Sequence, residues 1–352
     1  MTLKQLELKN YRNHLDRAFN FDEKVTLIVG PNGAGKTNIL EAIHLLSTGR
    51  PFRTLYDRGV INHSKGSATI KGIIKKDDER SKETRVGILI EKNQKYKNAS
   101  IKKIRVNGKS IRIGTISQFS NSILFSPLNM DLLTASPSGR RRFLDDILNQ
   151  TDEGYKKSLR NYTKARRQKN RILEIVRETG KGGSQLDYWN QKMLQIGSEI
   201  QGKRENLIKF FRQNLGGKIK TMDPSLTIDI EYNISSINKK RLEEYYEREI
   251  SACTSLIGPH RDDFSITQKG KNVGNYASRG QQRTLILCLK ICELKYIENA
   301  VGERPILLLD DIFSELDRDH RAALRNIVQK QQTILTATEI PEGFEDSVRI
   351  NL

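Results

Sequence analysis

The chain has 352 residues, with 61 Lys or Arg against 42 Asp or Glu, so its formal net charge is +19. Hydrophobic and charged fractions of 36% and 29% are typical of a soluble globular protein, and the length allows one large domain or two ordinary ones. No run of about 18 apolar residues occurs and the start lacks an apolar leader, so we expect a cytoplasmic protein with no membrane contact.

The positive charge favours a polyanionic partner, with nucleic acid ahead of an anionic membrane. A generally lysine-rich proteome would produce the same excess. The charge alone therefore leaves both readings open.

Patterns in the first third predict a β-rich segment. Alternating residues indicate strands over 2–13 and 17–30, and a helix follows over 37–49 that stops at a glycine. From 67 to 113 the pattern has period two, and Asn-Gly at 107–108 is a strong hairpin signal. We expect an antiparallel layer there.

The middle of the chain is predicted to be mainly helical. A helix is expected to start at Ser136 or Ser138, and two longer ones over 155–178 and 186–215 are split by GKGGS. A strand over 226–234 and a short helix over 241–250 follow. The last hundred residues predict a helix, the apolar strand PILLLDD, another helix and a strand.

The segment GPNGAGKT, residues 30–37, matches G-x-x-x-x-G-K-[ST] between an apolar strand and a helix. Its glycines let backbone N–H groups face a triphosphate, Lys36 can reach the β- and γ-phosphates, and Thr37 can ligate Mg²⁺. The alternative is a glycine-rich turn before a helix. The predicted ATP-binding residues here are Asn32, Gly33, Ala34, Gly35, Lys36, Thr37 and Asn38.

The segment ILLLDD, residues 306–311, reads as a buried parallel strand that ends in two carboxylates. Ligands sit at the C-terminal ends of such strands, so Asp310 is predicted to hold Mg²⁺. Asp311 is predicted to orient the attacking water, as a catalytic residue beside Lys36. For Asp311 alone, an acidic helix N-cap is the competing interpretation. The long separation from the phosphate loop predicts an insertion between two halves of a nucleotide-binding head.

Phosphate loop, insertion, YASRGQQRT, acidic strand, SELD and TATE follow in an order that resembles the ABC-type ATPases, in the branch containing the SMC and RecF proteins. LKNYRN, GRPFRT, SPSGRRRFLD and LIGPHRDDF are similar to segments of the RecF family and run along nearly the whole chain. The resemblance implies an α/β fold: an ABC-type ATPase head, with a mixed sheet around the phosphate loop and an antiparallel β layer, interrupted by a mainly helical lobe. We expect head halves at 1–125 and 251–352, and the lobe at 126–250.

The resemblance also implies residue roles. The signature residues would contact the γ-phosphate of ATP held by a second copy, so that ATP drives homodimerisation. Asp317 would lie at the same interface, Arg12 would approach the nucleotide, and Gln118 would sense the metal. The signature residues are Ser278, Arg279, Gly280 and Gln281.

Two departures from the family pattern bear on these roles. Leu128 replaces an acidic residue of a P-E-x-L pattern, and Asp311 stands where many relatives have glutamate. A shorter side chain should place water less well. We therefore expect slow hydrolysis, suited to a switch.

Residues 156–171 hold eight basic side chains and no acidic one. A solvated helical face is the default reading of such a run, but mutual repulsion and the ATPase resemblance favour DNA. One of Arg140 to Arg142 could instead pair with Asp145 or Asp146. The predicted DNA-binding residues are Arg140, Arg141, Arg142, Lys156, Lys157, Arg160, Lys164, Arg166 and Arg167.

The combined expectation is a RecF-like, weak DNA-dependent ATPase of recombinational repair and replication restart. It would use ATP and Mg²⁺, dimerise on double-stranded or gapped DNA, and work with mediators of the RecR and RecO type to load recombinase. The alternatives are an ABC transporter ATPase subunit and an SMC-like structural ATPase. The first would need a shorter span before the signature, and the second a far longer insertion.

Overall fold

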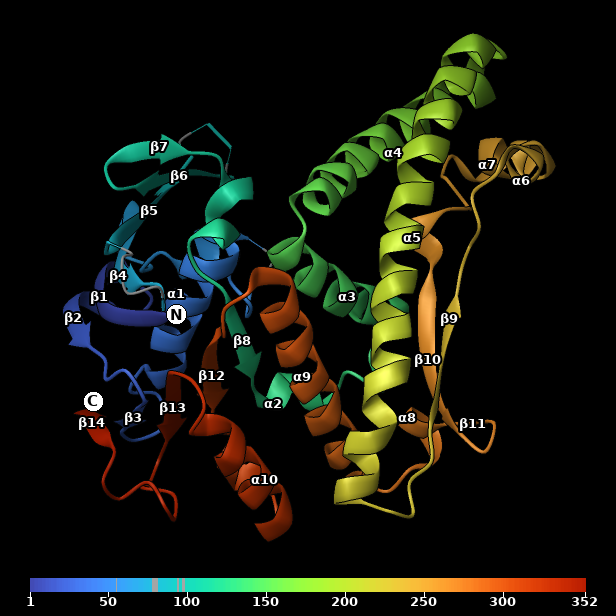
Figure 1. The fold of residues 1–352 in the computed structure, drawn as a ribbon. Coiled ribbons are helices and arrows are strands. Elements are labelled where there is room, and N and C mark those ends of the chain that lie inside the picture. Colours follow the sequence, from blue (N-terminus) through green and yellow to red (C-terminus); the bar gives the residue numbers. More distant parts are fainter. Residues whose placement is uncertain (55, 78–81, 94, 97–98) are drawn as a thin grey trace. The chain divides into compact units, whose positions relative to one another are not determined.

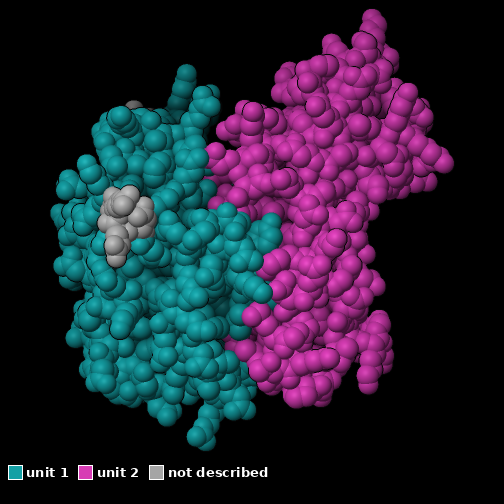
Figure 2. Space-filling model, viewed as in Figure 1, with its two compact units in different colours: residues 1–130, 290–352 teal, residues 131–289 magenta. Residues whose placement is uncertain are grey.

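The computed structural model describes residues 1–54, 56–77, 82–93, 95–96 and 99–352, which form two compact units. Met1–Met130 with Lys290–Leu352 form one unit, here called the head, and Asp131–Leu289 form the other, here called the lobe (Figure 2). The lobe continues beyond the expected limit at residue 250. The reason is that β10 (Asp263–Gln268) pairs with β9 (Asp229–Asn233), which keeps the residues after 250 in the lobe.

The head contains an antiparallel and a parallel sheet (Figure 1). The first has the order β2-β1-β4-β5-β6-β7, with β1 (Thr2–Tyr11), β2 (His14–Asn20), β4 (Ser67–Lys75), β5 (Thr84–Lys92), β6 (Ser100–Val106) and β7 (Lys109–Ile111). The second has the order β14-β3-β13-β12-β8, with β3 (Val25–Val29), β8 (Ser122–Phe125), β12 (Ile306–Asp310), β13 (Thr333–Ala337) and β14 (Val348–Asn351). The hairpin predicted at Asn107-Gly108 is confirmed, because both residues have positive φ, 48° and 80°, as a two-residue turn of this kind requires.

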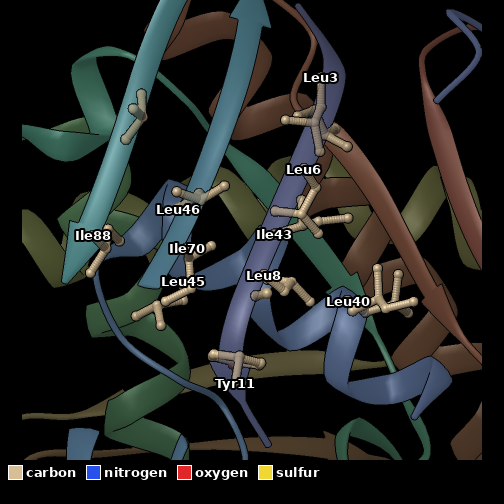
Figure 3. Close-up of a cluster of buried hydrophobic side chains, with 14 of the residues drawn as sticks. Leu3, Leu6, Leu8, Tyr11, Leu40, Ile43, Leu45, Leu46, Ile70 and Ile88 are labelled. Carbon is tan, nitrogen blue, oxygen red and sulfur yellow. The ribbon is translucent and has the colours of Figure 1, made fainter. Parts of the chain in front are cut away.

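Helix α1 (Lys36–Thr48) contacts strands of both head sheets, and its buried apolar side chains are part of the head's hydrophobic core. Figure 3 shows β1 side chains such as Leu6 and Leu8 on the side of α1, where Leu40 and Ile43 lie. Alternation along β1 sends its polar residues to the opposite face of the sheet. The remaining head elements are η1 (Asp57–Val60), η2 (Ile113–Gln118), α2 (Pro127–Met130), η4 (Ile312–Glu315) and α10 (Arg318–Val328).

The lobe is built on three helices and a small sheet of order β11-β10-β9. Ser136 caps the first helix by accepting a hydrogen bond from the Gly139 N–H, as one of the two predicted caps. A glycine turn with φ of 69° and 116° at Gly180 and Gly182 joins the two long helices. The elements are α3 (Pro137–Thr151), α4 (Glu153–Thr179), α5 (Gly183–Met222), β9 (Asp229–Asn233), α6 (Lys239–Glu244), α7 (Tyr246–Ala252), η3 (Pro259–Arg261), β10 (Asp263–Gln268), β11 (Lys271–Asn272), α8 (Val273–Tyr276) and α9 (Arg279–Val301), which begins in the lobe and ends in the head.

Some elements differ from the sequence expectation. The single short helix predicted over 241–250 is two helices, which break at Tyr245. Strands β8 and β14 carried no predictive pattern, because each has only four residues. Over the described ranges, no helix has the length and apolar character needed to span a bilayer.

Candidate nucleotide site and basic surface

The loop over 30–37 leads from β3 into α1 and has the backbone of an anion cradle. Gly33 and Gly35 adopt φ of 85° and 104°, backbone angles that residues with a Cβ atom strongly disfavour. A Cβ at Gly35 would also lie 2.6 Å from the side chain of Asn13. Helix α1 starts without a side-chain cap, so its first N–H groups can meet a phosphate.

The Lys36 side chain places its ammonium group beside the first residues of the phosphate loop. Its Nζ donates to the carbonyl oxygens of Gly30 and Pro31 at 2.6 and 3.0 Å. The side chain is buried, and both acceptors are neutral. A phosphate would offer a charged acceptor and a stronger hydrogen bond.

Thr37 and Asp310 meet although they lie far apart in the sequence. Thr37 Oγ1 donates to Asp310 Oδ1 at 2.8 Å, and Thr336 Oγ1 donates to the same oxygen at 2.9 Å. Burial raises the pKa of Asp310, and these two hydrogen bonds oppose that rise. Hydroxyl and carboxylate oxygens are hard ligands of the kind Mg²⁺ takes, so Thr37 and Asp310 fit the predicted metal.

Asp311 has an unusual backbone that Thr336 supports. Its φ is 49°, in the left-handed region that Asp tolerates better than most residues. Its N–H donates to Thr336 Oγ1 at 3.0 Å and to the Thr336 carbonyl at 3.2 Å. Thr336 was not predicted as a site residue; its only sequence signal was a polar residue within the buried strand β13.

Arg12 is held by a buried carboxylate beside the loop. Its Nε and Nη2 donate to the two oxygens of Glu41 at 2.8 and 3.0 Å, and Glu41 is fully buried. Asn13, the next residue, donates to the carbonyl oxygen of Ala34 in the phosphate loop at 3.0 Å. The YRN segment therefore buttresses the loop from the end of β1.

Arg53 was not predicted as a site residue, although it belongs to the GRPFRT segment that resembles the RecF family. Arg53 Nη1 donates to Asn38 Oδ1 at 3.0 Å, and its N–H donates to Glu41 at 3.2 Å. Its positive charge is also close enough to lower the pKa of Asp310. An exposed cation thus stands beside the predicted metal ligands.

The predicted signature residues form a helix start within the lobe. Ser278 Oγ accepts from the Gln281 N–H at 3.2 Å, while Gln281 Oε1 accepts from the Ser278 N–H at 3.1 Å. This reciprocal pair is a capping box at the start of α9. Ser278, Arg279 and Gly280 are exposed. The hydroxyl hydrogen of Ser278 remains a donor toward solvent.

The other predicted head residues have simpler surroundings. Asp317 is the N-cap of α10, where it accepts from the His320 N–H at 3.0 Å, and this bond lowers the pKa of Asp317. Gln118 is an exposed residue at the end of η2, and among the described residues no hydrogen bond joins it to Thr37 or Asp310. The Leu128 side chain lies outside the described part of the chain.

The basic residues of the lobe separate into internal and exposed groups. Arg140 pairs with Asp263 through two hydrogen bonds of 2.7 and 2.6 Å, and Arg141 Nη1 donates to the Asp262 carbonyl at 2.6 Å. The partner of Arg140 is therefore neither Asp145 nor Asp146. Lys169, within the predicted basic run, is fully buried against Glu249 with Nζ to Oε2 at 2.5 Å.

Five exposed cations of α4 recur at intervals of three and four residues, which places them on one helical face. We call this set the α4 stripe. Lys156 and Arg166 are half-buried beside it, and Arg142 is exposed on α3. The α4 stripe comprises Lys157, Arg160, Lys164, Arg167 and Arg171.

The GPHRDD segment has structural partners within the lobe. Asp262 accepts from Gln201, Arg204 and Tyr232, and Arg204 also bonds Asp145 at 2.8 Å. His260 lies between the Tyr162 hydroxyl at 2.8 Å and the Ser255 carbonyl at 2.9 Å. Burial lowers the pKa of His260 to about 4, so the ring is neutral at pH 7. In the described ranges no three His, Cys, Asp or Glu side chains gather as a metal site.

Known proteins match this chain over nearly its full length. The sequence profile described as "RecF/RecN/SMC N terminal domain" matches residues 2–340. "DNA replication and repair protein RecF" of Natranaerobius thermophilus is 34% identical, over 99% of this chain and 94% of that protein. The protein of the same name from Bacillus cytotoxicus is 33% identical, over 98% and 94% of the two chains.

Solved structures agree with these sequence relatives. "Structure of the recombination mediator protein RecF-ATPrS in RecFOR pathway" has a TM-score of 0.89 at 29% identity and covers 100% of this chain and 96% of that chain. An SMC head bound to a domain of ScpA, at 16% identity and a TM-score of 0.54, shares the fold. The predicted ABC-type head with its antiparallel layer and helical insertion is thus confirmed, and the chain belongs to the RecF/RecN/SMC family of ATPases, in its RecF branch.

Proposed function

We propose that the chain is an ATP-dependent switch in DNA replication and repair. It binds ATP and Mg²⁺, dimerises on duplex or gapped DNA, and releases the DNA when it slowly hydrolyses ATP. The observation that carries the proposal is the contact between Thr37 and Asp310, which brings a phosphate-loop hydroxyl to a carboxylate at a strand end. The names of the RecF relatives and the RecF structures described with ATP and its analogue support it.

The phosphate loop would hold the triphosphate through residues 32–38, with the Lys36 ammonium moving from its carbonyl partners to phosphate oxygens. Mg²⁺ would supply charge neutralisation at the phosphates when held by Thr37 and Asp310, with Gln118 as a further candidate ligand. Arg12 uses Nε and Nη2 on Glu41, so its Nη1 edge would face the nucleotide. Asp311 would orient the attacking water.

Dimerisation would bring the signature of a second copy to this site. Ser278, Arg279, Gly280 and Gln281 would meet the γ-phosphate, with Asp317 at the same interface. The capping box leaves the Ser278 hydroxyl hydrogen available as a donor at the exposed start of α9. ATP binding and dimerisation would then be linked, because nucleotide favours the state that binds it.

Sedimentation velocity with and without ATP tests this arrangement, using the wild type, Ser278→Arg and the control Ser251→Arg, whose serine is exposed on α7 of the lobe. We expect ATP to dimerise the wild type and the control but not Ser278→Arg. Dimerisation of Ser278→Arg at the wild-type ATP concentration would remove the signature from the proposal, and no dimer with any variant would remove the switch.

The α4 stripe is the surface through which DNA would bind. It contains four of the predicted DNA-binding residues, and Arg171 is added because it is exposed at the same helical spacing. Its five cations lie within residues 157–171, and their ends are separated along the helix by about 21 Å at 1.5 Å per residue. That length matches about six phosphates of one strand at 3.4 Å spacing. Lys156, Arg166 and Arg142 would flank it, whereas Arg140 and Arg141 are engaged within the lobe and are not included.

Duplex, single-stranded and gapped DNA binding across a salt series tests this surface. Full use of the five cations predicts a slope of log K against log salt near −4.5, from about −0.9 per phosphate contact on duplex DNA. Binding that ignores salt would contradict the proposal. We further propose that mediators of the RecR and RecO type join the DNA-bound dimer and help load recombinase, which co-sedimentation on gapped DNA would test.

A further inference from the structure

The face of the antiparallel sheet that points away from α1 contains a hollow of about 670 Å³. It lies across β1, β4, β5 and β6, and the strand register places Glu7, Lys71, Gly87 and Arg105 in one row across it. None of these residues belongs to the nucleotide site or to the α4 stripe. We call this hollow the sheet groove.

The sheet groove exists because a glycine stands where a side chain would fill it. A Cβ placed on Gly87 would meet no atom within 4 Å. Ile73 and Leu89 lie beside it and are half-buried on the solvent side of the sheet, so the floor is apolar. The opposite face of the sheet packs on α1 (Figure 3), which holds this floor in place.

Cations form the rim of the sheet groove. Lys71 pairs with Glu7 at 3.2 Å, and Lys103 pairs with Glu91 at 2.8 Å. Arg85 and Arg105 are also exposed, on neighbouring strands. Across the described ranges, neither of their guanidinium groups has a carboxylate within ion-pair distance. Two guanidinium groups next to an apolar hollow form a site that can bind carboxylates in the bidentate geometry.

We propose that the sheet groove is a docking site for an acidic segment of a partner protein, which seats an apolar side chain over Gly87 and sets its carboxylates on Arg85 and Arg105. Charge complementarity selects an acidic occupant. The apolar floor favours a peptide over duplex DNA, because a duplex presents charged phosphates on its outside and keeps its bases stacked within, so it has no apolar group to bury there. The volume is within the range of about 300 to 1,000 Å³ that binding pockets span.

The test uses a fluorescein-labelled peptide, Asp-Glu-Phe-Glu-Asp, and its Phe-to-Ala analogue, measured by fluorescence anisotropy at low salt on the full chain. Gly87→Leu fills the hollow and keeps every cation, whereas Arg85→Glu with Arg105→Glu reverses the rim. Arg112→Glu is the matched control, since Arg112 is exposed and lies outside the groove. Melting temperature and fluorescent-nucleotide binding verify folding, and Arg85→Gln with Arg105→Gln is the milder replacement.

We expect Phe-peptide affinity to fall at least tenfold in Gly87→Leu and in the rim variants, to stay unchanged in Arg112→Glu, and to be weaker for the Ala peptide. Equal affinity of Gly87→Leu and wild type would overturn the proposal. So would rim variants that lose duplex DNA while keeping the peptide, because the groove would then be a nucleic-acid site. The proposed function is tested separately, by nucleotide-dependent dimerisation and by DNA binding to the α4 stripe.

Discussion

The replacement Lys169→Met separates a structural cation from a DNA-binding one within the same basic run. Lys169 is fully buried, and its Nζ lies 2.5 Å from Glu249 Oε2. Burial lowers the pKa of Lys169, and the carboxylate of Glu249 opposes that change. Removing the ammonium leaves the Glu249 charge buried without its counter-charge, a change that typically costs about 3–5 kcal/mol.

For a unit of the lobe's size, Asp131–Leu289, that loss corresponds to a fall in melting temperature of about 6–20 °C, at about 2–4 °C per kcal/mol. Arg167→Met is the matched control, because Arg167 lies two residues earlier and is exposed. Its stability should change by less than about 0.5 kcal/mol. Its DNA affinity should fall, with the salt slope reduced by about one.

The double variant Lys169→Met with Glu249→Gln should recover most of the lost stability. Glutamine removes the unpaired charge and keeps an oxygen for the Leu256 N–H, which donates to Glu249 Oε1 at 2.8 Å. Calorimetry and a DNA titration below the transition measure both quantities. If Lys169→Met melts like the wild type and loses DNA affinity like Arg167→Met, the buried-pair interpretation is wrong.

Three further predictions concern the nucleotide site and the lobe. Thr336→Val removes the hydrogen-bond donor to Asp310 and the acceptor for the Asp311 N–H. The kcat for ATP hydrolysis should therefore fall about tenfold or more, with little change in nucleotide affinity. A kcat equal to that of the wild type in a coupled assay would contradict this role. Gly35→Ala strains a φ of 104° and collides with Asn13, so fluorescent-nucleotide binding should be abolished, and retained binding would refute the cradle. The neutral His260 stabilises the fold fully above the unfolded pKa near 6.5, and this contribution is lost as pH falls toward about 4. Stability should therefore drop less between pH 7 and pH 5 in His260→Gln, by on the order of 2 kcal/mol at most, and equal pH profiles would exclude this role.

Much of the molecule follows from local sequence alone. Period-two alternation determined the antiparallel layer, Asn107-Gly108 determined its hairpin, and glycines with Lys36 determined the phosphate loop. These features depend on contacts between near neighbours in the chain, which spacing and residue type specify. The order of the motifs then pointed to the right family.

Tertiary structure decided what each charged residue meets. Spacing cannot show that Thr336 supports both Asp310 and Asp311, or that Arg53 stands beside them, because those contacts join distant segments. Nor can it separate Lys169 from Arg167, since both are basic residues of one helix and only packing against α7 buries the first. The residues Ser278 to Gln281 combine both levels: the order of the motifs identified them as the signature segment, and the fold shows that they form a capping box with an exposed Ser278.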